Sequence, residues 1–231
     1  MQTKSNVSSL KWCEYYAELT QYKRLVQRTT EFIKDTLSVA GVTYVACSFG
    51  KDSSVMLHLI LQQTPDILVR FASHPETRLL DNYDEVISWW RGEQNINYEE
   101  IYCEGGLVKV KNDQRNKLSQ GRFDSFFVGI RAEESFGRRL SLKKHGQFHR
   151  MADGRIKICP VAWWSERDII TYIAMNGLPY LNKYGVEGFQ SRTTSGIPRT
   201  HIHECLSSLK SRDIQAFNKL KMMFTDVDYF V

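Results

Sequence analysis

The apolar residues change their spacing at one point in the chain, and the change predicts a strand followed by a helix. Residues 42–47 form a β-branched and apolar run that is typical of a buried strand. A short polar turn follows at residues 48–54, and apolar residues then recur at helical spacing, at Val55, Met56, Leu59 and Ile60. A strand, a tight turn and a helix open a βαβ unit, so the pattern predicts an α/β fold.

Shorter apolar runs predict further strands later in the chain. Residues 66–72 and 96–102 indicate a second and a third strand, and residues 126–128 a short one before a glycine. Residues 147–159 have the form of a β-hairpin, because Asp153-Gly154 lies in their middle. Together these runs predict a doubly wound, mostly parallel sheet.

Apolar residues at helical spacing predict helices before the first strand and between the strands. Residues 5–39 are expected to form one or two helices, with Ser8 or Ser9 as the first N-cap. Residues 79–91 are expected to form another helix, and residues 105–118 a polar surface helix or loop.

The last third of the chain is expected to be helical around one glycine-rich loop. Ser165 is a good N-cap for a helix that Gly177 ends. Residues 184–199 have the composition of a loop, and residues from Ile202 or Ser207 to Phe224 indicate one final helix. The final helix and the helices before the first strand are expected to be appendages to the predicted sheet.

Composition excludes several kinds of site. The hydrophobic share of 42% and the charged share of 25% are ordinary for a globular protein of 231 residues. No apolar run approaches a membrane span and the first residues lack a secretory apolar region, so we expect a cytoplasmic protein with no membrane partner. The five cysteines include no Cys-x-x-Cys pair, which argues against a zinc ribbon, a disulfide framework and an iron–sulfur cluster. The net charge of +5 suits a nucleotide or nucleic-acid partner without proving one.

The polar turn at residues 48–54 has the chemistry of a phosphate site. Gly50 lets the backbone approach a ligand closely or take a positive φ, and the free N–H groups of the following helix attract anions. Donors for phosphate oxygens are Lys51 and the hydroxyls of Ser48, Ser53 and Ser54.

Asp52 is out of place in a simple anion site, because its charge would repel phosphate. Its presence makes sense if a Mg²⁺ ion lies between its carboxylate and the phosphates. The turn is not a Walker A loop, since Val45 and Asp52 stand where that motif needs a glycine and a serine or threonine. The plain alternative is a serine-rich N-cap between a strand and a helix.

Residues 48–53 resemble the PP-loop, Ser-Gly-Gly-X-Asp-Ser, of the ATP pyrophosphatase superfamily. They resemble more narrowly the branch that contains the phosphoadenosine phosphosulfate (PAPS) reductases and the ATP pyrophosphatases of DNA phosphorothioation. Phe49 replaces the first glycine, so the turn has less backbone freedom than the family pattern. The resemblance implies an adenine nucleotide alpha-hydrolase-like domain at residues 42–180, with helices 1–41 packed on it and a loop and helix at 181–231 that belong to it.

A second stretch, residues 126–135, is similar to the Gly-X-Arg-X-X-X-Ser sequence that follows a strand in the same relatives. It places Gly129 and Arg131 in the site, because the relatives' arginine lies beside the nucleotide phosphates. A guanidinium can clamp two phosphate oxygens and offset the charge of leaving pyrophosphate. The alternative is that Arg131 pairs with Glu133 or Glu134 on a solvated loop.

Two further features agree with this resemblance. Residues 159–180 are similar to a Pro-Leu-X-X-Trp, helix and Leu-Pro-Tyr passage of PAPS reductase relatives, which supports fold more than mechanism. The family places the adenine at the carboxyl end of the second strand, here near Phe71 and Ser73, where open α/β sheets bind ligands. His74 is either a part of that site or a plain surface residue.

Basic residues after the second motif have two readings. Residues 138–145 are a basic run that either contacts a polyanion or forms a solvated face, and Arg138 is a candidate phosphate contact. Arg192 and Arg199 either close over a ligand's phosphates or belong to a static loop.

The resemblance implies attack on the α-phosphorus of ATP, with Mg-pyrophosphate as the leaving group. Lys51, Asp52 and Arg131 are the predicted catalytic residues, and Asp52 is the predicted metal ligand. The predicted nucleotide contacts are Ser48, Phe49, Gly50, Lys51, Ser53, Ser54, Phe71, Ser73, Gly129, Arg131 and Arg138. The leading hypothesis is an ATP pyrophosphatase that adenylylates the DNA backbone for sulfur incorporation, beside a cysteine desulfurase and in an oligomeric state that the sequence leaves open.

Other functions stay open. A sulfonucleotide reductase would need a nucleophilic cysteine from a C-terminal Glu-Cys-Gly-Leu-His motif, and this chain has Glu204-Cys205-Leu206-Ser207 instead. A non-catalytic nucleotide-binding regulator could share the fold. A tRNA-thiolating enzyme is a further alternative, but no separate RNA-binding domain is evident.

Overall fold

The described part of the chain is built on one six-stranded sheet. The computed structural model describes residues 4–74, 79, 81–103, 117–189, 202–224 and 227. The strands lie in the order β3-β2-β1-β4-β6-β5 across the sheet. Their bounds are β1 Thr43–Ala46, β2 Leu68–Ser73, β3 Asn97–Tyr102, β4 Ser125–Val128, β5 Phe148–Arg150 and β6 Ile156–Ile158.

Neighbouring strands run parallel, except that β5 pairs antiparallel with β6. In the central strand β1, Val45 lies opposite Val69 of β2 and Phe127 of β4. The chain extends the sheet to one side of β1 with β2 and β3, and then crosses to the other side with β4. The prediction of a doubly wound, mostly parallel sheet is confirmed, and its switch point lies between β1 and β4.

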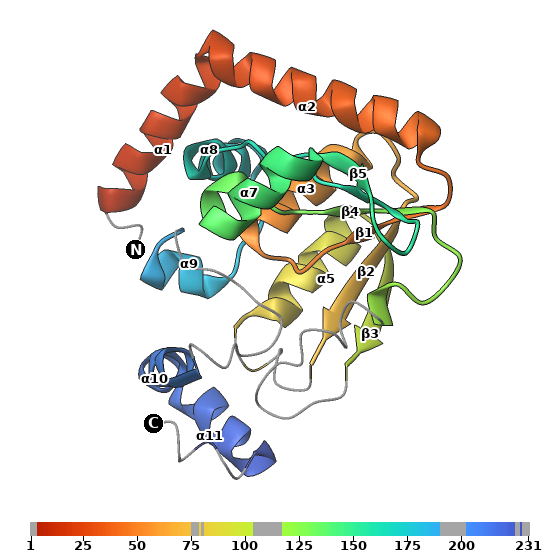
Figure 1. Cartoon of the computed structure of the whole chain (residues 1–231). Coiled ribbons are helices and arrows are strands. Elements are labelled where there is room, and N and C mark those ends of the chain that lie inside the picture. The colour runs from red at the N-terminus through yellow and green to blue at the C-terminus, as the bar shows by residue number, and fades with distance from the viewer. Residues whose placement is uncertain are drawn as a thin grey trace.

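Helices cover the sheet and extend beyond it (Figure 1). Their bounds are α1 Lys4–Glu18, α2 Thr20–Val39, α3 Lys51–Leu61, α5 Tyr83–Glu93, α7 Phe136–His145, α8 Glu166–Asn176, α9 Asn182–Glu187, α10 Ile202–Arg212 and α11 Ile214–Met223, with a 3-10 turn η1 at Ala132–Glu134. None of these described helices has the length and apolar character needed to cross a bilayer.

The strand alternation gives the two sheet faces different contents. Val45, Val69 and Phe127 are fully buried in the main hydrophobic core, which also takes residues from α2, α3, α5, α8 and α9. On the opposite face, Tyr44 of β1 stacks on its β4 neighbour Phe126 at a centroid distance of 5.7 Å. The apolar period-2 positions of the sequence therefore correspond to the core face that carries α3.

The C-terminal helices form a smaller cluster of their own. Its buried members on α10 and α11 are Ile202, Leu206, Leu209, Phe217 and Leu220. Figure 1 shows α10 and α11 lying together, at the end of the molecule opposite to α1 and α2.

Some predicted helix bounds are wrong. Helix α1 begins at Lys4, so Ser8 and Ser9 lie within it and cannot be its N-cap. The single helix predicted at the C-terminus is two helices, because the Asp213 carboxylate caps α11 by accepting a bond from the Ala216 N–H at 2.9 Å. A helix break needs only one good capping side chain, and the apolar spacing does not reveal it.

Helix α9 replaces the first part of the loop predicted at residues 184–199. Its first N–H groups, from Asn182 and Lys183, donate to the carboxylate of Asp81 at 2.9 and 3.1 Å. The capping group is thus far away in sequence, which is why local pattern did not predict this helix. Most of the predicted segment 105–118 lies outside the described residues.

Candidate functional site

The candidate site lies where two loops meet at the sheet's switch point. One loop leads from β1 into α3, and the other leaves the carboxyl end of β4 at Gly129. A Cβ atom on Gly129 would lie 2.7 Å from Ser53 Cα and 2.8 Å from Ser53 N. Only glycine at this position lets the second loop touch the backbone of α3. Ligands of open α/β sheets bind in this crevice.

The turn before α3 has its positive φ at Phe49, with a value of 52°, whereas Gly50 has φ −75°. Of the two uses predicted for Gly50, the positive φ is therefore wrong, whereas a close approach to a ligand stays a prediction; the strain falls on Phe49, which replaces a family glycine. The Phe49 ring is fully buried and lies edge-on to Phe71 at a centroid distance of 5.4 Å. Burial of the ring offsets the unfavourable backbone.

The serine hydroxyls hold the turn together. Ser48 Oγ lies 3.1 Å from Ser53 Oγ, and Ser53 Oγ donates to the Gly50 carbonyl at 3.0 Å. Ser54 Oγ is buried and makes no hydrogen bond within the described residues. These serines thus stand at the helix start, as predicted for donors to a phosphate.

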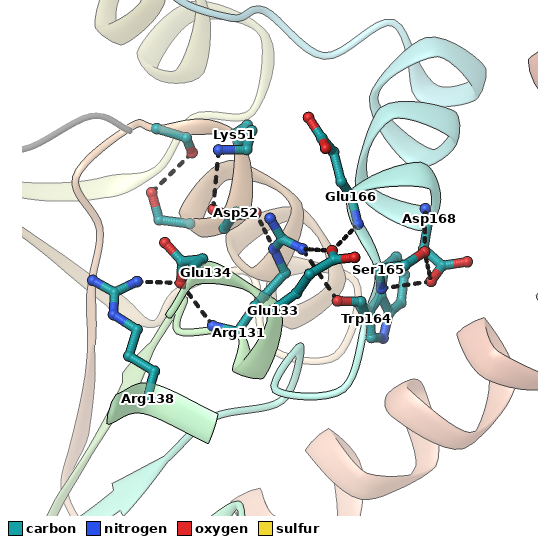
Figure 2. A network of polar contacts seen from close by, with 12 residues as sticks. Lys51, Asp52, Arg131, Glu133, Glu134, Arg138, Trp164, Ser165, Glu166 and Asp168 are labelled. Carbon is teal, nitrogen blue, oxygen red and sulfur yellow. Dashed lines mark hydrogen bonds and ion pairs between the residues drawn. The ribbon is translucent and has the colours of Figure 1, made fainter. Parts of the chain in front are cut away.

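Lys51, Asp52 and Arg131 come together as one buried charge cluster (Figure 2). Arg131 Nε donates to Asp52 Oδ1 at 2.6 Å, and Lys51 Nζ lies 3.6 Å from Asp52 Oδ2. Each of the three residues exposes less than a tenth of its surface. The structure therefore brings all three predicted catalytic residues to one place.

Arg131 is held by contacts on its other side as well. Its NH1 group donates to Glu133 Oε2 at 2.7 Å and to the Trp164 carbonyl at 3.2 Å. Glu133 Oε2 also accepts the first N–H of α8, from Glu166, at 2.5 Å. The alternative pairing of Arg131 with Glu133 is thus real, but it occurs together with the Asp52 contact on a buried and oriented guanidinium.

Arg138 is connected to the same network through Glu134. Glu134 accepts the backbone N–H of Arg131 at 2.9 Å and also pairs with the Arg138 guanidinium (Figure 2). Arg138 thus touches a residue that positions Arg131.

Burial and charge act in opposite directions on this cluster. Burial raises the pKa of the Asp52 carboxyl, while the charges of Lys51 and Arg131 act to lower it. Burial acts to lower the pKa of Arg131, but Asp52 and Glu133 outweigh it and the pKa is raised. Arg131 therefore stays cationic, and its positive charge is available to an anion that replaces Asp52 or Glu133.

The turn does not have the ligands of a resident metal site. No group of three or more histidine, cysteine, aspartate or glutamate side chains could hold a metal ion within the described ranges. Both oxygens of Asp52 already face cations, so a divalent ion would have to displace Lys51 or Arg131. The side chains of the described residues therefore do not form a resident Mg²⁺ site.

The predicted adenine contacts lie at the end of β2. Phe71 and Ser73 are buried, and the Ser73 carbonyl accepts the Cys103 N–H at 2.7 Å. The Phe71 side chain belongs to the main core, so only its main chain could serve a base. His74 is also buried and is not a surface residue.

The cysteines of the core are thiols with little tendency to ionise. Burial raises the pKa of Cys47 to about 12 and that of Cys159 to about 11. Of the cysteines, all of which lie in the described residues, Cys205 on α10 is the partly exposed one and the others are buried. A thiolate is the reactive form, so Cys47 and Cys159 are poor nucleophiles.

Tyr184 of α9 is a site residue that the sequence did not predict. Its hydroxyl accepts the backbone N–H of Lys51 at 3.3 Å, and its ring centroid lies 5.1 Å from Lys51 Nζ. Tyr184 follows Lys51 by 133 residues, and no local signal connects them. Arg192 and Arg199, for which the sequence left a phosphate contact and a static loop equally open, lie outside the described residues.

A cavity of about 240 Å³ lies beside the cluster, next to Glu133. Its lining residues are Ala132, Glu133, Arg139, Ala162, Trp163, Trp164 and Ser165. Arg139 and the half-exposed Trp163 give it a cation and an aromatic face. The other basic residues of the predicted run, Lys143, Lys144 and His145, form the last turn of α7, where the helix dipole favours cations.

Comparison with known proteins agrees with this geometry. A protein-family model described as phosphoadenosine phosphosulfate reductase domain matches residues 43–191. A phosphoadenosine 5'-phosphosulfate reductase of Xanthomonas campestris pv. campestris is 31% identical over an alignment 160 residues long, and the match covers 59% of this chain. That match spans 63% of the relative's own length.

Solved structures of low sequence identity share the fold. An FMN adenylyltransferase from Candida glabrata, in complex with FAD and inorganic pyrophosphate, has a TM-score of 0.57 at 15% identity and covers 76% of this chain and 66% of its own. A U34-tRNA thiolase from Methanococcus maripaludis has a TM-score of 0.50 at 13% identity and covers 91% of this chain and 80% of its own. The sheet with its switch-point loop is thus an adenine nucleotide alpha-hydrolase-like fold.

Proposed function

Because the chain belongs to the phosphoadenosine phosphosulfate reductase domain family, we propose that it binds an adenine nucleotide at residues 48–54 and cleaves ATP to AMP and pyrophosphate. The AMP is first transferred to an acceptor, which is thereby activated for sulfur incorporation. The observation that carries the proposal is the buried cluster of Lys51, Asp52 and Arg131 at the switch point.

This cluster has the charges that the departure of pyrophosphate requires. Lys51 and Arg131 are buried cations that need little reorganisation, and oriented charges of this kind stabilise developing negative charge. The N-terminus of α3 adds its N–H groups and its dipole. In this proposal Asp52 and Glu133 hold the cations in place until the phosphates of ATP take over part of the pairing.

The proposed step needs no general base when the acceptor is a phosphodiester oxygen of DNA. That oxygen carries no proton and forms a bond to the α-phosphorus, while the bond to the bridging oxygen breaks and pyrophosphate leaves with the electron pair. The persulfide of a cysteine desulfurase would then attack the activated phosphorus and expel AMP, and a thiol reductant would cleave the resulting S–S bond to leave the phosphorothioate. The proposal includes magnesium only as an ion carried on the phosphates of ATP, and the predicted contact of Asp52 with it would require Asp52 to release Lys51 or Arg131.

The position of the acceptor is proposed from the surface next to Arg131. The cavity with Arg139 and Trp163 opens beside Glu133, and the basic last turn of α7 follows it in the chain. Cations next to an aromatic face suit a nucleic-acid strand, because they bind phosphates while the ring stacks on a base.

The test is to incubate α-labelled ATP with the protein, with and without a DNA oligonucleotide, and to resolve AMP, ADP and pyrophosphate. AMP with pyrophosphate supports the proposal, and ADP contradicts it. Arg131→Lys should lower the rate about 10²-fold, because it keeps a charge but loses the oriented guanidinium. Arg150→Gln removes an exposed arginine whose side chain, within the described residues, donates to Gly154 of its own hairpin, and it should leave the rate unchanged.

A second function, reduction of a sulfonucleotide, is favoured by a different observation. Curated relatives of the chain are PAPS reductases, and Cys205 is partly exposed while the other cysteines are buried. This function predicts that PAPS with a thiol reductant yields sulfite and that Cys205→Ser abolishes the yield. Sulfite formation that depends on Cys205, without AMP and pyrophosphate from ATP, would replace the first proposal with the second.

A further inference from the structure

The N-terminus of α3 is capped by a side chain from a distant helix. Its N-cap residue, Gly50, has no side chain to accept a bond, and the N–H of Lys51 instead donates to the Tyr184 hydroxyl. We propose that Tyr184 closes the phosphate site in the absence of a nucleotide, and that a phosphate oxygen displaces its hydroxyl on binding. The inference rests on the proposed function only in that a nucleotide binds at this turn.

Tyr184 covers both groups that a phosphate would use at Lys51. The hydroxyl occupies the backbone N–H, and the ring lies over the ammonium at 5.1 Å from its centroid. Lys51 is 3% exposed, and the Tyr184 ring and Asp52 are among the groups that contact it. The hydroxyl oxygen thus marks a position that a phosphate oxygen would take.

The Tyr184 contact is weak enough to be displaced. At 3.3 Å, the hydrogen bond from Lys51 N is longer than the usual range of about 2.7–3.2 Å for such bonds. A phosphate would bring negative charge to the same N–H and to Nζ, and charge-assisted bonds are shorter and roughly twice as strong as neutral ones. Exchange of the hydroxyl for a phosphate oxygen is therefore favourable at Lys51.

Helix α9, which carries Tyr184, is joined to α10 through Asp81, so a movement of α9 also affects α10. Asp81 caps the start of α9 and also lies 3.7 Å from Arg212 NH1 at the end of α10. On the other side, the Phe189 ring stacks on Tyr184 at 5.4 Å. A shift of α9 is thus passed through Asp81 to α10, the helix that carries Cys205.

The test compares Tyr184→Phe with wild type in the binding of ATP and of inorganic pyrophosphate. The variant keeps the ring but removes the competing hydroxyl, so both ligands should bind about three- to tenfold more tightly. Tyr180→Phe is the control, because Tyr180 is partly exposed and packs on the same Phe189 without a described contact to Lys51. This control should leave both affinities unchanged, and thermal unfolding checks that each variant is folded.

Hydrogen exchange gives a second readout that does not depend on turnover. Addition of ATP to the wild type should speed exchange of the amides of α9 and slow that of the first turn of α3. Unchanged or weaker binding by Tyr184→Phe, or protection of α9 by ATP, would overturn the inference. If Tyr184→Phe binds both ligands more tightly and neither protein forms AMP from ATP, the result supports this inference and contradicts the proposed catalysis.

Discussion

At the scale of single residues, the site depends on the close contact between Gly129 and the backbone of Ser53, which leaves no room for a methyl group. Gly129 lets the loop after β4 touch the backbone of Ser53, and a side chain there would meet main-chain atoms that cannot rotate away. We expect Gly129→Ala to destabilise the protein by about 1–3 kcal/mol, the usual cost of overpacking, and to weaken ATP binding by moving Arg131.

Denaturant unfolding and ATP titration measure both effects. Gly137→Ala is the matched control, because Gly137 lies within α7 and an added Cβ meets nothing within 4 Å. Alanine is the better helix former there, so a gain of up to about 1 kcal/mol is expected. Equal stability of the two variants would show that the loops are not in close contact.

A second single-residue feature is the charge of Asp52, which stabilises the buried cluster. Asp52→Asn keeps the shape of the side chain but removes the buried carboxylate that Lys51 and Arg131 both face, while Arg131 keeps its contact with Glu133. Loss of one partner of a buried pair typically costs about 3–5 kcal/mol, so a large fall in the free energy of unfolding is expected.

Asp153→Asn is the comparison for this measurement. Asp153 pairs with Arg155 on an exposed hairpin, and such surface pairs are worth about 0–1 kcal/mol. If both asparagine variants unfold at the same urea concentration, the Asp52 cluster is not the buried network described above.

At the scale of elements, the start of α8 connects helix capping to the site. Ser165 and Asp168 form a capping box, in which Ser165 Oγ accepts the Asp168 N–H and Asp168 accepts the Ser165 N–H at 2.7 Å. The next N–H, of Glu166, donates to the Glu133 carboxylate that holds Arg131. Asp168 also accepts the Tyr16 hydroxyl at 2.9 Å and so ties α1 to α8.

Removal of the Ser165 cap should lower both the stability of the protein and its affinity for ATP. Ser165→Ala is expected to cost about 1 kcal/mol, the usual loss for an N-cap serine, and to lower ATP affinity through Glu133. Thermal unfolding and ATP titration test both effects. Ser165→Thr retains a capping oxygen and should stay close to wild type; a loss as large as that of alanine would mean that the hydroxyl is not the cause.

At the scale of the whole molecule, α3 is held between the sheet and α8. The contact between α3 and α8 includes a titratable side chain, His58. His58 of α3 has its Nδ1 atom 3.0 Å from the Tyr172 hydroxyl of α8, and burial lowers its pKa. Above the unfolded pKa of about 6.5 both states are neutral, and below it the unfolded state binds more protons. Stability is therefore fully present above that pH and is lost as pH falls through the folded pKa.

Urea unfolding at pH 7.5 and pH 5.5 measures this loss. His58→Gln can still bond to Tyr172 but does not titrate, so its stability should fall less between the two pH values than that of the wild type. Burial also lowers the pKa of His149, which adds a loss of the same sign in both proteins. An identical fall in wild type and variant would assign the pH dependence to groups other than His58.

The sequence by itself determined the strands, the main helices and the place of the turn at residues 48–54, because these follow from local rules. Side-chain period distinguishes strand from helix, and caps such as Ser165 and Gly177 act within a few residues. The motif at residues 48–53 and the arginine at position 131 also stood out locally, and the structure brings them together at the predicted strand ends.

Tertiary structure alone decided how those residues are paired. Asp52 and Arg131 are 79 residues apart, and Lys51 and Tyr184 are 133 apart, so neither contact has a local signature. The cap of α9 by Asp81 crosses a similar distance, and it made a helix where composition predicted a loop. Spacing along the chain shows on which face of a strand or helix a side chain lies. The residue that it contacts there depends on how the sheet brings distant segments together.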